Sequence, residues 1–167
     1  MYVRTLVHAA RGTARAAAAI NRPVFYRMSS SAATPYRTVA TPNAPSAIGP
    51  YSQAVVYNGT AYLSGCIPFD PKSMAVVEGG VEEQAKQALA NLFAVAEAAG
   101  SDKSHILKVT VFLKDMNDFA KVNAIYEQVR APLTQAFAPY KPARSAVEVA
   151  RLPRDVLVEV EAVAAAK

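Results

Sequence analysis

The sequence predicts one α+β domain in which two helices cover one face of a mixed β-sheet. Its 167 residues are enough for one domain and a tail, but hardly for two full-sized cores. Apolar residues make up 52% and charged residues 19%, which is the composition of a globular chain. Five or six strand-like stretches accompany two helix-like ones, and two helices cannot cover both faces of such a sheet.

The first strands are expected in the stretch that ends at Ile67. Thr38–Thr41 is a short candidate edge strand, and Tyr51–Tyr57 and Thr60–Ile67 are longer strands. Asn58-Gly59 separates the longer two, and this dipeptide is typical of a two-residue hairpin turn. The segment therefore predicts a β-hairpin that is entered from a proline-rich loop.

A helix and a further strand follow the hairpin. Val81–Ala99 carries apolar residues at close to the 3.6-residue period of a helix, and its first turn holds two glutamates that suit the helix dipole. Gly100 is the expected C-terminal stop of this helix. Ile106–Leu113 is rich in β-branched residues and predicts a strand.

The second helix and two final strands complete the expected domain. Asn117 or Asp118 can cap the helix, and Pro132 is expected to mark its end. Ser145–Ala150 and Val156–Ala164 are predicted as the last two strands.

The last strand is apolar on both sides. Alternation places Val158 and Val160 on one face, and Glu159, Glu161 and Val163 on the other. A sheet face without helices needs another partner, so the pattern predicts an oligomer in which sheets meet around a shared core. The pattern does not set the number of subunits.

The basic charge of the chain is confined to its N-terminal part. Six of the 18 basic residues and none of the 13 acidic residues lie in residues 1–37, so the remainder carries a net charge of −1. The formal net charge of +5 therefore gives no support for nucleic-acid binding by the domain. No run of eighteen apolar residues occurs, so we expect no transmembrane helix.

Residues 1–34 are expected to be a mitochondrial presequence, followed by the domain in residues 35–167. The segment is rich in Arg, Ala and Ser, lacks acidic residues, and can place its arginines on one side of a helix. The alternative is an extension without a function. Cleavage is expected between Tyr26 and Thr34 and gives a protein of the mitochondrial matrix, whereas a start at Met28 gives a cytosolic form.

Few side chains are available for nucleophilic or metal chemistry. His8 and His105 are the two histidines, and Cys66 is the single cysteine. These counts exclude an internal disulfide, a multi-thiolate zinc site and a two-histidine metal motif at helical spacing. The sequence therefore predicts no metal site.

Two features point to chemistry from the residues alone. Arg144 lies just after Pro142 at the entry to a strand, where it can grip a carboxylate with two hydrogen bonds, although it can also be an ordinary surface arginine. Glu159 and Glu161 share one face of the most apolar strand. An inward-facing glutamate there can act as an acid–base group, and the alternative is a solvated face.

Six segments together resemble one protein family. They are Ile48–Ala54, Tyr62–Gly65, Thr110–Phe119, Val122–Tyr126, Pro142–Pro153 and Val158–Ala162. In this order they resemble the Rid family, also called YjgF/YER-type proteins or reactive intermediate deaminases. The resemblance covers about residues 37–165 without a sizeable gap, and the basic leader is similar to that of mitochondrial members.

The resemblance implies a fold and an activity. The fold is the chorismate-mutase-like (Rid) fold, and members form homotrimers with sites in the clefts between subunits. Archetypal members hydrolyse 2-aminoacrylate and 2-aminocrotonate, through their imine tautomers, to 2-oxo acids and ammonia without a cofactor or a metal. Pyridoxal-phosphate-dependent dehydratases release these substrates, so the implied partners are small imino acids and further copies of the chain, not a membrane or a nucleic acid.

The resemblance also assigns roles to the residues that carry chemistry. Arg144 matches the arginine that pairs with the substrate carboxylate, and Glu159, in preference to Glu161, matches the glutamate that positions the attacking water. Tyr51 and Ser64 match residues that shape the pocket and hydrogen-bond the substrate or water. Together they would bind the substrate carboxylate and hold one water. This is enough to hydrolyse an imine, because its carbon is already electrophilic.

Three further positions match the substrate-binding part of the family site. Gly65 and Ala146 match positions whose backbone approaches the ligand, and Asn123 matches a supporting position near the cleft. Many members have cysteine where this chain has Ala146, and glutamine where it has Cys66. Strand alternation predicts that Cys66 shares the face of Ser64.

Two other functions stay open at this point. The first is a non-catalytic small-molecule binder or chaperone-like trimer, against which the joint presence of Arg144 and Glu159 favours the deaminase. The second is an endoribonuclease or translation inhibitor, a label that some relatives carry. The charge of −1 beyond residue 37 and the lack of a catalytic histidine argue against it.

We expect the leader to be absent from the mature protein. The acid-free basic segment ahead of a nearly neutral domain is typical of a processed presequence. N-terminal sequencing of the protein from isolated mitochondria should begin between about Arg27 and Pro35. An intact Met1 in that fraction would contradict the prediction.

Overall fold

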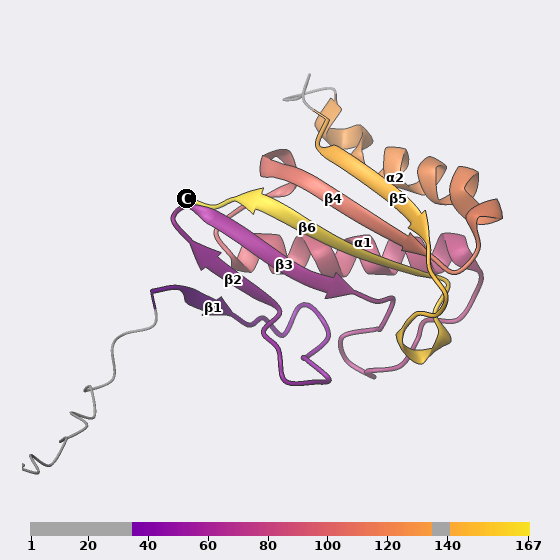
Figure 1. Cartoon of the computed structure of the whole chain (residues 1–167), viewed down its shortest axis with the longest axis horizontal. Helices are drawn as coiled ribbons and strands as arrows, with labels where there is room; N and C mark the ends of the chain where they lie inside the picture. The colour runs from indigo at the N-terminus through magenta and orange to yellow at the C-terminus, as the bar shows by residue number, and fades with distance from the viewer. Residues whose placement is uncertain (1–34, 135–140) are drawn as a thin grey trace, which may run out of the picture. The chain divides into compact units, whose positions relative to one another are not determined.

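The computed structural model describes residues 35–134 and 141–167, which form one six-stranded sheet and two helices (Figure 1). The sheet order is β1-β2-β3-β6-β4-β5. Only β4 and β5 pair in parallel among the described neighbours, so the sheet is mixed, as predicted. The expected presequence and its cleavage site lie outside the described residues. The elements are β1 (Arg37–Val39), β2 (Ala54–Tyr57), β3 (Thr60–Cys66), α1 (Val81–Ala98), β4 (Ile106–Leu113), α2 (Phe119–Thr134), β5 (Ala143–Glu148) and β6 (Val158–Ala165).

The predicted hairpin joins β2 to β3. Tyr57 pairs with Thr60 across the two-residue turn, and both turn residues have positive φ, 48° at Asn58 and 72° at Gly59. This backbone matches the right-handed twist of the flanking strands, which is why the Asn-Gly dipeptide favours it. The hairpin prediction is confirmed.

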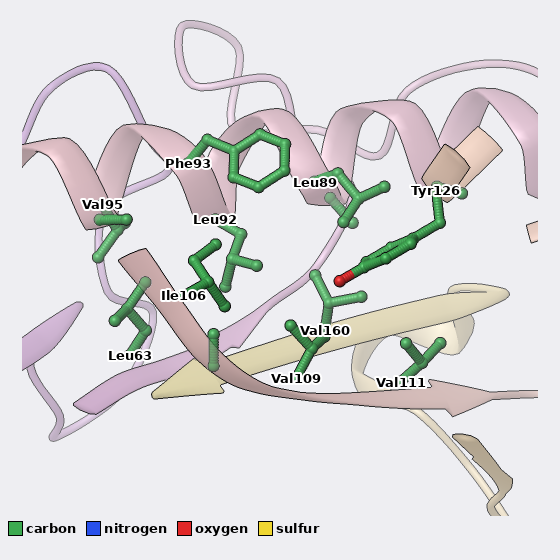
Figure 2. Close-up of a cluster of buried hydrophobic side chains, with 14 of the residues drawn as sticks. Leu63, Leu89, Leu92, Phe93, Val95, Ile106, Val109, Val111, Tyr126 and Val160 are labelled. Carbon is green, nitrogen blue, oxygen red and sulfur yellow. The ribbon is translucent and has the colours of Figure 1, made fainter. Parts of the chain in front are cut away.

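Strand β6 lies in the middle of the sheet, between β3 and β4. Val158 and Val160 are buried on the face that both helices cover, and Glu159 and Glu161 are half-buried on the opposite face. The alternation predicted for this strand is therefore confirmed. Figure 2 shows the apolar cluster between α1 and the sheet, with side chains from both layers interdigitating. Its labelled members are Leu63, Leu89, Leu92, Phe93, Val95, Ile106, Val109, Val111, Tyr126 and Val160.

The second face of the sheet carries no helix within the described residues (Figure 1). Strand pairing places Tyr62, Phe112 and Val147 on this face, and Tyr62 and Val147 are 51% and 41% exposed. We call this surface, together with Glu159 and Glu161, the open face. Its apolar side chains agree with an oligomer, whose subunit number stays a prediction.

The second helix is preceded by a short turn and extends beyond its predicted end. A 3₁₀ turn, Met116–Asp118, precedes it, and the Asp115 carboxylate caps this turn by accepting from the Asn117 amide at 2.8 Å. Asn117 and Asp118 therefore lie inside this turn, directly before the helix begins at Phe119. The helix also continues past Pro132 to Thr134, since a proline near a helix end removes a single backbone donor.

Strand β2 begins at Ala54, later than the predicted Tyr51, because Gln53 ties down the preceding loop. Its side-chain amide donates to the carbonyls of Ala44 and Pro45, at 3.3 and 2.7 Å. Its oxygen accepts from the Thr41 amide at 2.6 Å. These bonds satisfy loop backbone that no strand partner reaches.

A bulge in β3 reverses the orientation predicted for Cys66. Leu63 pairs with Ala162 and Cys66 with Val160, so two residues of β3 oppose the single Glu161 of β6. Cys66 therefore returns to the helix-covered face, where it packs against the core. The prediction that it shares the face of Ser64 was wrong, because simple alternation does not allow for an extra residue.

No helix among the described residues is both long and apolar enough to span a bilayer. In the same part of the chain, no three His, Cys, Asp or Glu side chains gather in a way that could hold a metal ion.

We predict that Asn91→Ala lowers the free energy of unfolding by about 1–3 kcal/mol. Asn91 is buried on α1, and its Nδ2 donates to the carbonyls of Ile67 and Phe69 at 3.0 and 2.9 Å. Alanine leaves both carbonyls without this donor. Urea unfolding measures the change, with Glu97→Ala on the exposed side of the same helix as control. Equal stability of the two variants would show that water replaces the amide.

Candidate active site

Tyr51, Ser64 and Gly65, three of the predicted site residues, surround one small cavity at the end of β3. The cavity measures about 30 Å³, which is room for about one or two water molecules. It is lined by the loop before β2, by the end of β3 with the residues that follow it, and by α1. The remaining lining residues are Ala44, Pro45, Ser46, Ile48, Gln53, Cys66, Ile67, Phe69, Asn91 and Val95.

The polar groups of this cavity are held by local backbone. The Tyr51 hydroxyl accepts from the Ile48 amide at 3.4 Å, and the Tyr51 amide donates to the Gly49 carbonyl at 2.9 Å. The Ser64 hydroxyl donates to the Ser52 carbonyl at 2.7 Å. Since that bond uses the hydroxyl hydrogen, the Ser64 oxygen can still accept from a ligand or a water.

Glu159 reaches the backbone of Gly65 across the pair of strands β3 and β6. Its carboxylate occupies the space that a Cβ atom at Gly65 would need. Glycine at this point of the bulge therefore permits a close approach that any other residue would block. The contact brings Glu159 to the edge of the group formed by Ser64 and Gly65.

Burial raises the pKa of Glu159 above its ordinary value, and the neighbouring charge of Glu161 raises it further. A carboxyl group in this environment holds a proton more readily than a surface glutamate, as an acid–base residue requires. Burial also raises the pKa of the Cys66 thiol to about 12, with a smaller contribution from Glu159. Cys66 is therefore a neutral thiol at pH 7 and lacks the thiolate of a nucleophilic cysteine.

Arg144 lies on the edge strand β5 and points toward α2. It pairs with Val109, whose side chain is buried on the helix-covered face. Its Nη2 donates to Asn123 Oδ1 at 2.5 Å, so the structure brings these two predicted residues together. Ala146 lies two residues further along β5, on the same face.

One chain does not bring Arg144 and Glu159 together. Glu159 pairs with Phe112 on the open face, whereas Arg144 pairs with Val109 on the helix-covered face. Phe112 and Val109 are three residues apart, so the two charged residues are offset by about 10 Å along the strands, and β4 separates them by about another 10 Å. A three- or four-carbon acid cannot contact both within one chain.

Sequence reasoning missed two residues that support the cavity. Gln53 organises the loop that carries Tyr51, and Asn91 holds the backbone that follows β3. Asn91 could have been noticed, because it is a polar residue among the apolar positions of the α1 stripe. Gln53 gave no such signal, since the sequence placed it inside the predicted strand Tyr51–Tyr57 and not in a loop.

Comparisons with known proteins show the family of this chain. A family model described as "Endoribonuclease L-PSP" matches residues 41–166. The chain belongs to this family, the Rid or YjgF family. The Rid resemblance seen in the motifs is thus confirmed, and so is the fold.

Individual Rid proteins match at high identity. The Salmonella typhimurium protein named "2-iminobutanoate/2-iminopropanoate deaminase" is 55% identical over 128 residues, which cover 77% of this chain and 96% of that protein. The crystal structure of the Escherichia coli YjgF gene product matches with a TM-score of 0.71 at 50% identity, covering 78% of this chain and 99% of that one. The structure of Escherichia coli TdcF with bound serine has a TM-score of 0.72 at 41% identity and the same coverage.

We predict that Gly65→Ala displaces the Glu159 carboxylate while leaving the fold intact. The new Cβ would overlap the far end of a flexible side chain, which can swing away. The displaced carboxyl should become more exposed, so its pKa should fall toward the ordinary value. NMR titration of Glu159 measures this shift. Gly49→Ala is the control, because its Cβ meets Tyr51 at an ordinary 3.4 Å. An unchanged titration in Gly65→Ala would contradict the close approach.

Proposed function

We propose that this Rid protein hydrolyses 2-imino acids, the tautomers of 2-aminoacrylate and 2-aminocrotonate, to 2-oxo acids and ammonia. The observation that carries the proposal is the half-buried Glu159, with its raised pKa, held against Gly65, which lines a water-sized cavity. Several relatives of about 50% identity are named 2-iminobutanoate/2-iminopropanoate deaminase, which supports the substrate class.

The proposed reaction needs one carboxylate contact and one activated water. Arg144 binds the substrate carboxylate through its guanidinium. Glu159 accepts a proton from water as the water oxygen bonds to the imine carbon, and the carbon–nitrogen double bond becomes single. Glu159 then returns the proton to nitrogen, which prepares ammonia as the leaving group. As the carbon–nitrogen bond breaks, the new hydroxyl gives its proton to Glu159 and a carbonyl forms. Glu159 passes this second proton to the ammonia, which leaves as ammonium. An iminium acid and water thus yield a 2-oxo acid and ammonium, with no change of oxidation state.

The proposal requires more than one copy of the chain. Since Arg144 and Glu159 of one chain lie on opposite faces of the sheet, we propose that Arg144 of one subunit meets Glu159 of the next in a homotrimer. The apolar residues of the open face are available for such contacts. Light scattering should give about three times the subunit mass, stable to salt because the contacts are mainly apolar.

The supply of substrate and the location are part of the proposal. Imino acids hydrolyse spontaneously, so an enzyme for them must act near their source, and pyridoxal-phosphate-dependent serine and threonine dehydratases are the expected source. On the basis of the expected presequence we propose the mitochondrial matrix as the location, and the cytosol for any form that starts at Met28. The proposal assigns the protein itself no cofactor.

We predict that Arg144→Ala abolishes useful turnover while the assembly persists. A charge-assisted contact to a carboxylate contributes roughly ten- to over a hundredfold in rate constant, enough to approach the spontaneous background. Arg144→Lys should recover little, because an ammonium lacks the planar fork. The measurement is a coupled assay, in which a dehydratase generates the imine and semicarbazide traps what remains. Near-normal turnover by an assembled Arg144→Ala protein would remove the arginine from its role.

We predict that Glu159→Gln, but not Glu161→Gln, loses turnover. Both glutamates lie on the open face, but it is the Glu159 carboxylate that lies closest to Gly65, a residue that lines the cavity. Glutamine keeps the size of the side chain and cannot accept the proton. Turnover should fall by about 10²–10⁴, or to the spontaneous rate if that is reached first.

The matched glutamine variants also separate binding from chemistry. Glu159→Gln should still bind a non-reactive 2-oxo acid, because Arg144 makes that contact. If the wild type and all variants bind the 2-oxo acid but none hydrolyses the imine, the protein is a non-catalytic small-molecule binder. An inactive Glu161→Gln beside an active Glu159→Gln would show that the residue assignment is wrong.

A further inference from the structure

The guanidinium of Arg144 is surrounded by three side chains of one helix face. Phe119, Asn123 and Tyr126 follow one another on α2 at spacings of four and three residues, which places them on the same side of the helix. The guanidinium carbon lies 4.9 Å from the ring centroid of Tyr126 and 5.9 Å from that of Phe119. Both distances are in the range of cation–π contacts.

The Tyr126 ring is a fixed support. The residue is 9% exposed and belongs to the core cluster that contains Leu89 and Val160. Figure 2 shows its side chain reaching from α2 into this cluster, between the helix layer and the sheet. The guanidinium therefore rests on a ring that core packing holds in place, although Arg144 itself is exposed.

The contact to Asn123 constrains how Arg144 can hold a carboxylate. A guanidinium has five N–H donors, and these form two edges that can each bind a carboxylate with two bonds. Nη2 contributes one hydrogen to each edge. Since Asn123 Oδ1 takes one Nη2 hydrogen at 2.5 Å, one of the two edges is engaged and the other is left for a ligand.

We propose that Asn123 is a positioning residue that selects the edge of Arg144 that meets the substrate carboxylate, and so orients the imine carbon toward the water of Glu159. This inference rests on the proposed function. The rings of Tyr126 and Phe119 contact the flat face of the guanidinium. The hydrogen bond from Nη2 to Asn123 fixes how the guanidinium is rotated within its own plane. A carboxylate bound through the other edge would direct the imine carbon elsewhere.

The amide is the side chain that suits this task. Its oxygen accepts the hydrogen bond without neutralising Arg144, which keeps its full charge for the ligand. An aspartate at position 123 would be almost the same size, but it would form an ion pair with the guanidinium and compete with the substrate carboxylate. The exchange Asn123→Asp therefore tests the arrangement with little change in shape.

The experiment compares Asn123→Asp and Asn123→Ala with the wild type in the full assembly. Asn117→Asp adds the same charge near the start of α2, where the side chain is exposed, and serves as the matched control. Titration with 2-oxobutanoate measures carboxylate binding without turnover. The coupled imine assay gives kcat and KM for each protein.

We expect the two variants to fail differently. Asn123→Asp should weaken 2-oxobutanoate binding about tenfold or more, because its carboxylate occupies Arg144. Asn123→Ala should keep binding within about threefold while kcat falls about tenfold, because a misoriented substrate reacts slowly. Asn117→Asp should behave as the wild type in both assays. A residue that merely supported the fold would lower stability and would not separate binding from kcat in this way.

Two results would overturn the inference. One is 2-oxobutanoate binding by Asn123→Asp at wild-type strength, and the other is an unchanged kcat in Asn123→Ala. If one variant fails to assemble, the other alone decides. If the wild type binds 2-oxobutanoate but hydrolyses no imine, the proposed function fails, and the titration of Asn123→Asp still decides whether Asn123 controls Arg144. Absence of 2-oxobutanoate binding by the wild type would refute both.

Discussion

The site depends on the pairing of β6 with the bulged end of β3. Strand β6 lies in the sheet between β3 and β4. Its side chains therefore point alternately into the core beneath the helices and onto the open face. Val158 and Val160 fill the core beneath the helices, while Glu159 stays half-buried on the open face. The bulge then brings Gly65 within reach of this carboxylate, and the missing side chain provides the space. Core packing and the position of the proposed acid–base group thus follow from one strand register.

The same sheet keeps the positive group of the site away from the negative one. Arg144 at the β5 edge is held by α2, and Glu159 in the sheet centre faces away from α2. This separation prevents a direct ion pair within the chain, which would cancel both charges. It also means that the two groups become useful to one substrate when a second subunit supplies the missing half, as the proposed trimer does.

The comparisons and the geometry support the function at different levels. Family membership and the fold follow from a model that spans residues 41–166 and from solved structures at up to 50% identity among those compared. The choice of imino acids comes from the names of relatives and from the chemistry of Glu159 and Arg144. The arrangement of Asn123, Phe119 and Tyr126 around Arg144 is a property of this chain's own helix face.

The sequence by itself determined the local elements and the types of residue in the site. The Asn58-Gly59 turn, helix α1 and strand β4 were predicted closely, because turn chemistry and hydrophobic period are local properties. Motif matching named Arg144 and Glu159 without any geometry. The ends of the elements were predicted less well. An example is the turn before α2, which the Asp115 side chain caps by binding a backbone amide. Which side chain makes such a bond does not follow from the hydrophobic period.

Tertiary structure alone decided how these residues relate in space. The insertion of β6 between β3 and β4 joins segments almost a hundred residues apart, and no local pattern encodes that pairing. The bulge turned Cys66 into the core, against simple alternation, because two residues of β3 face one of β6. The separation of Arg144 from Glu159 likewise follows from strand order and register. These are non-local constraints, set by which surfaces can be buried together and not by the preferences of neighbouring residues.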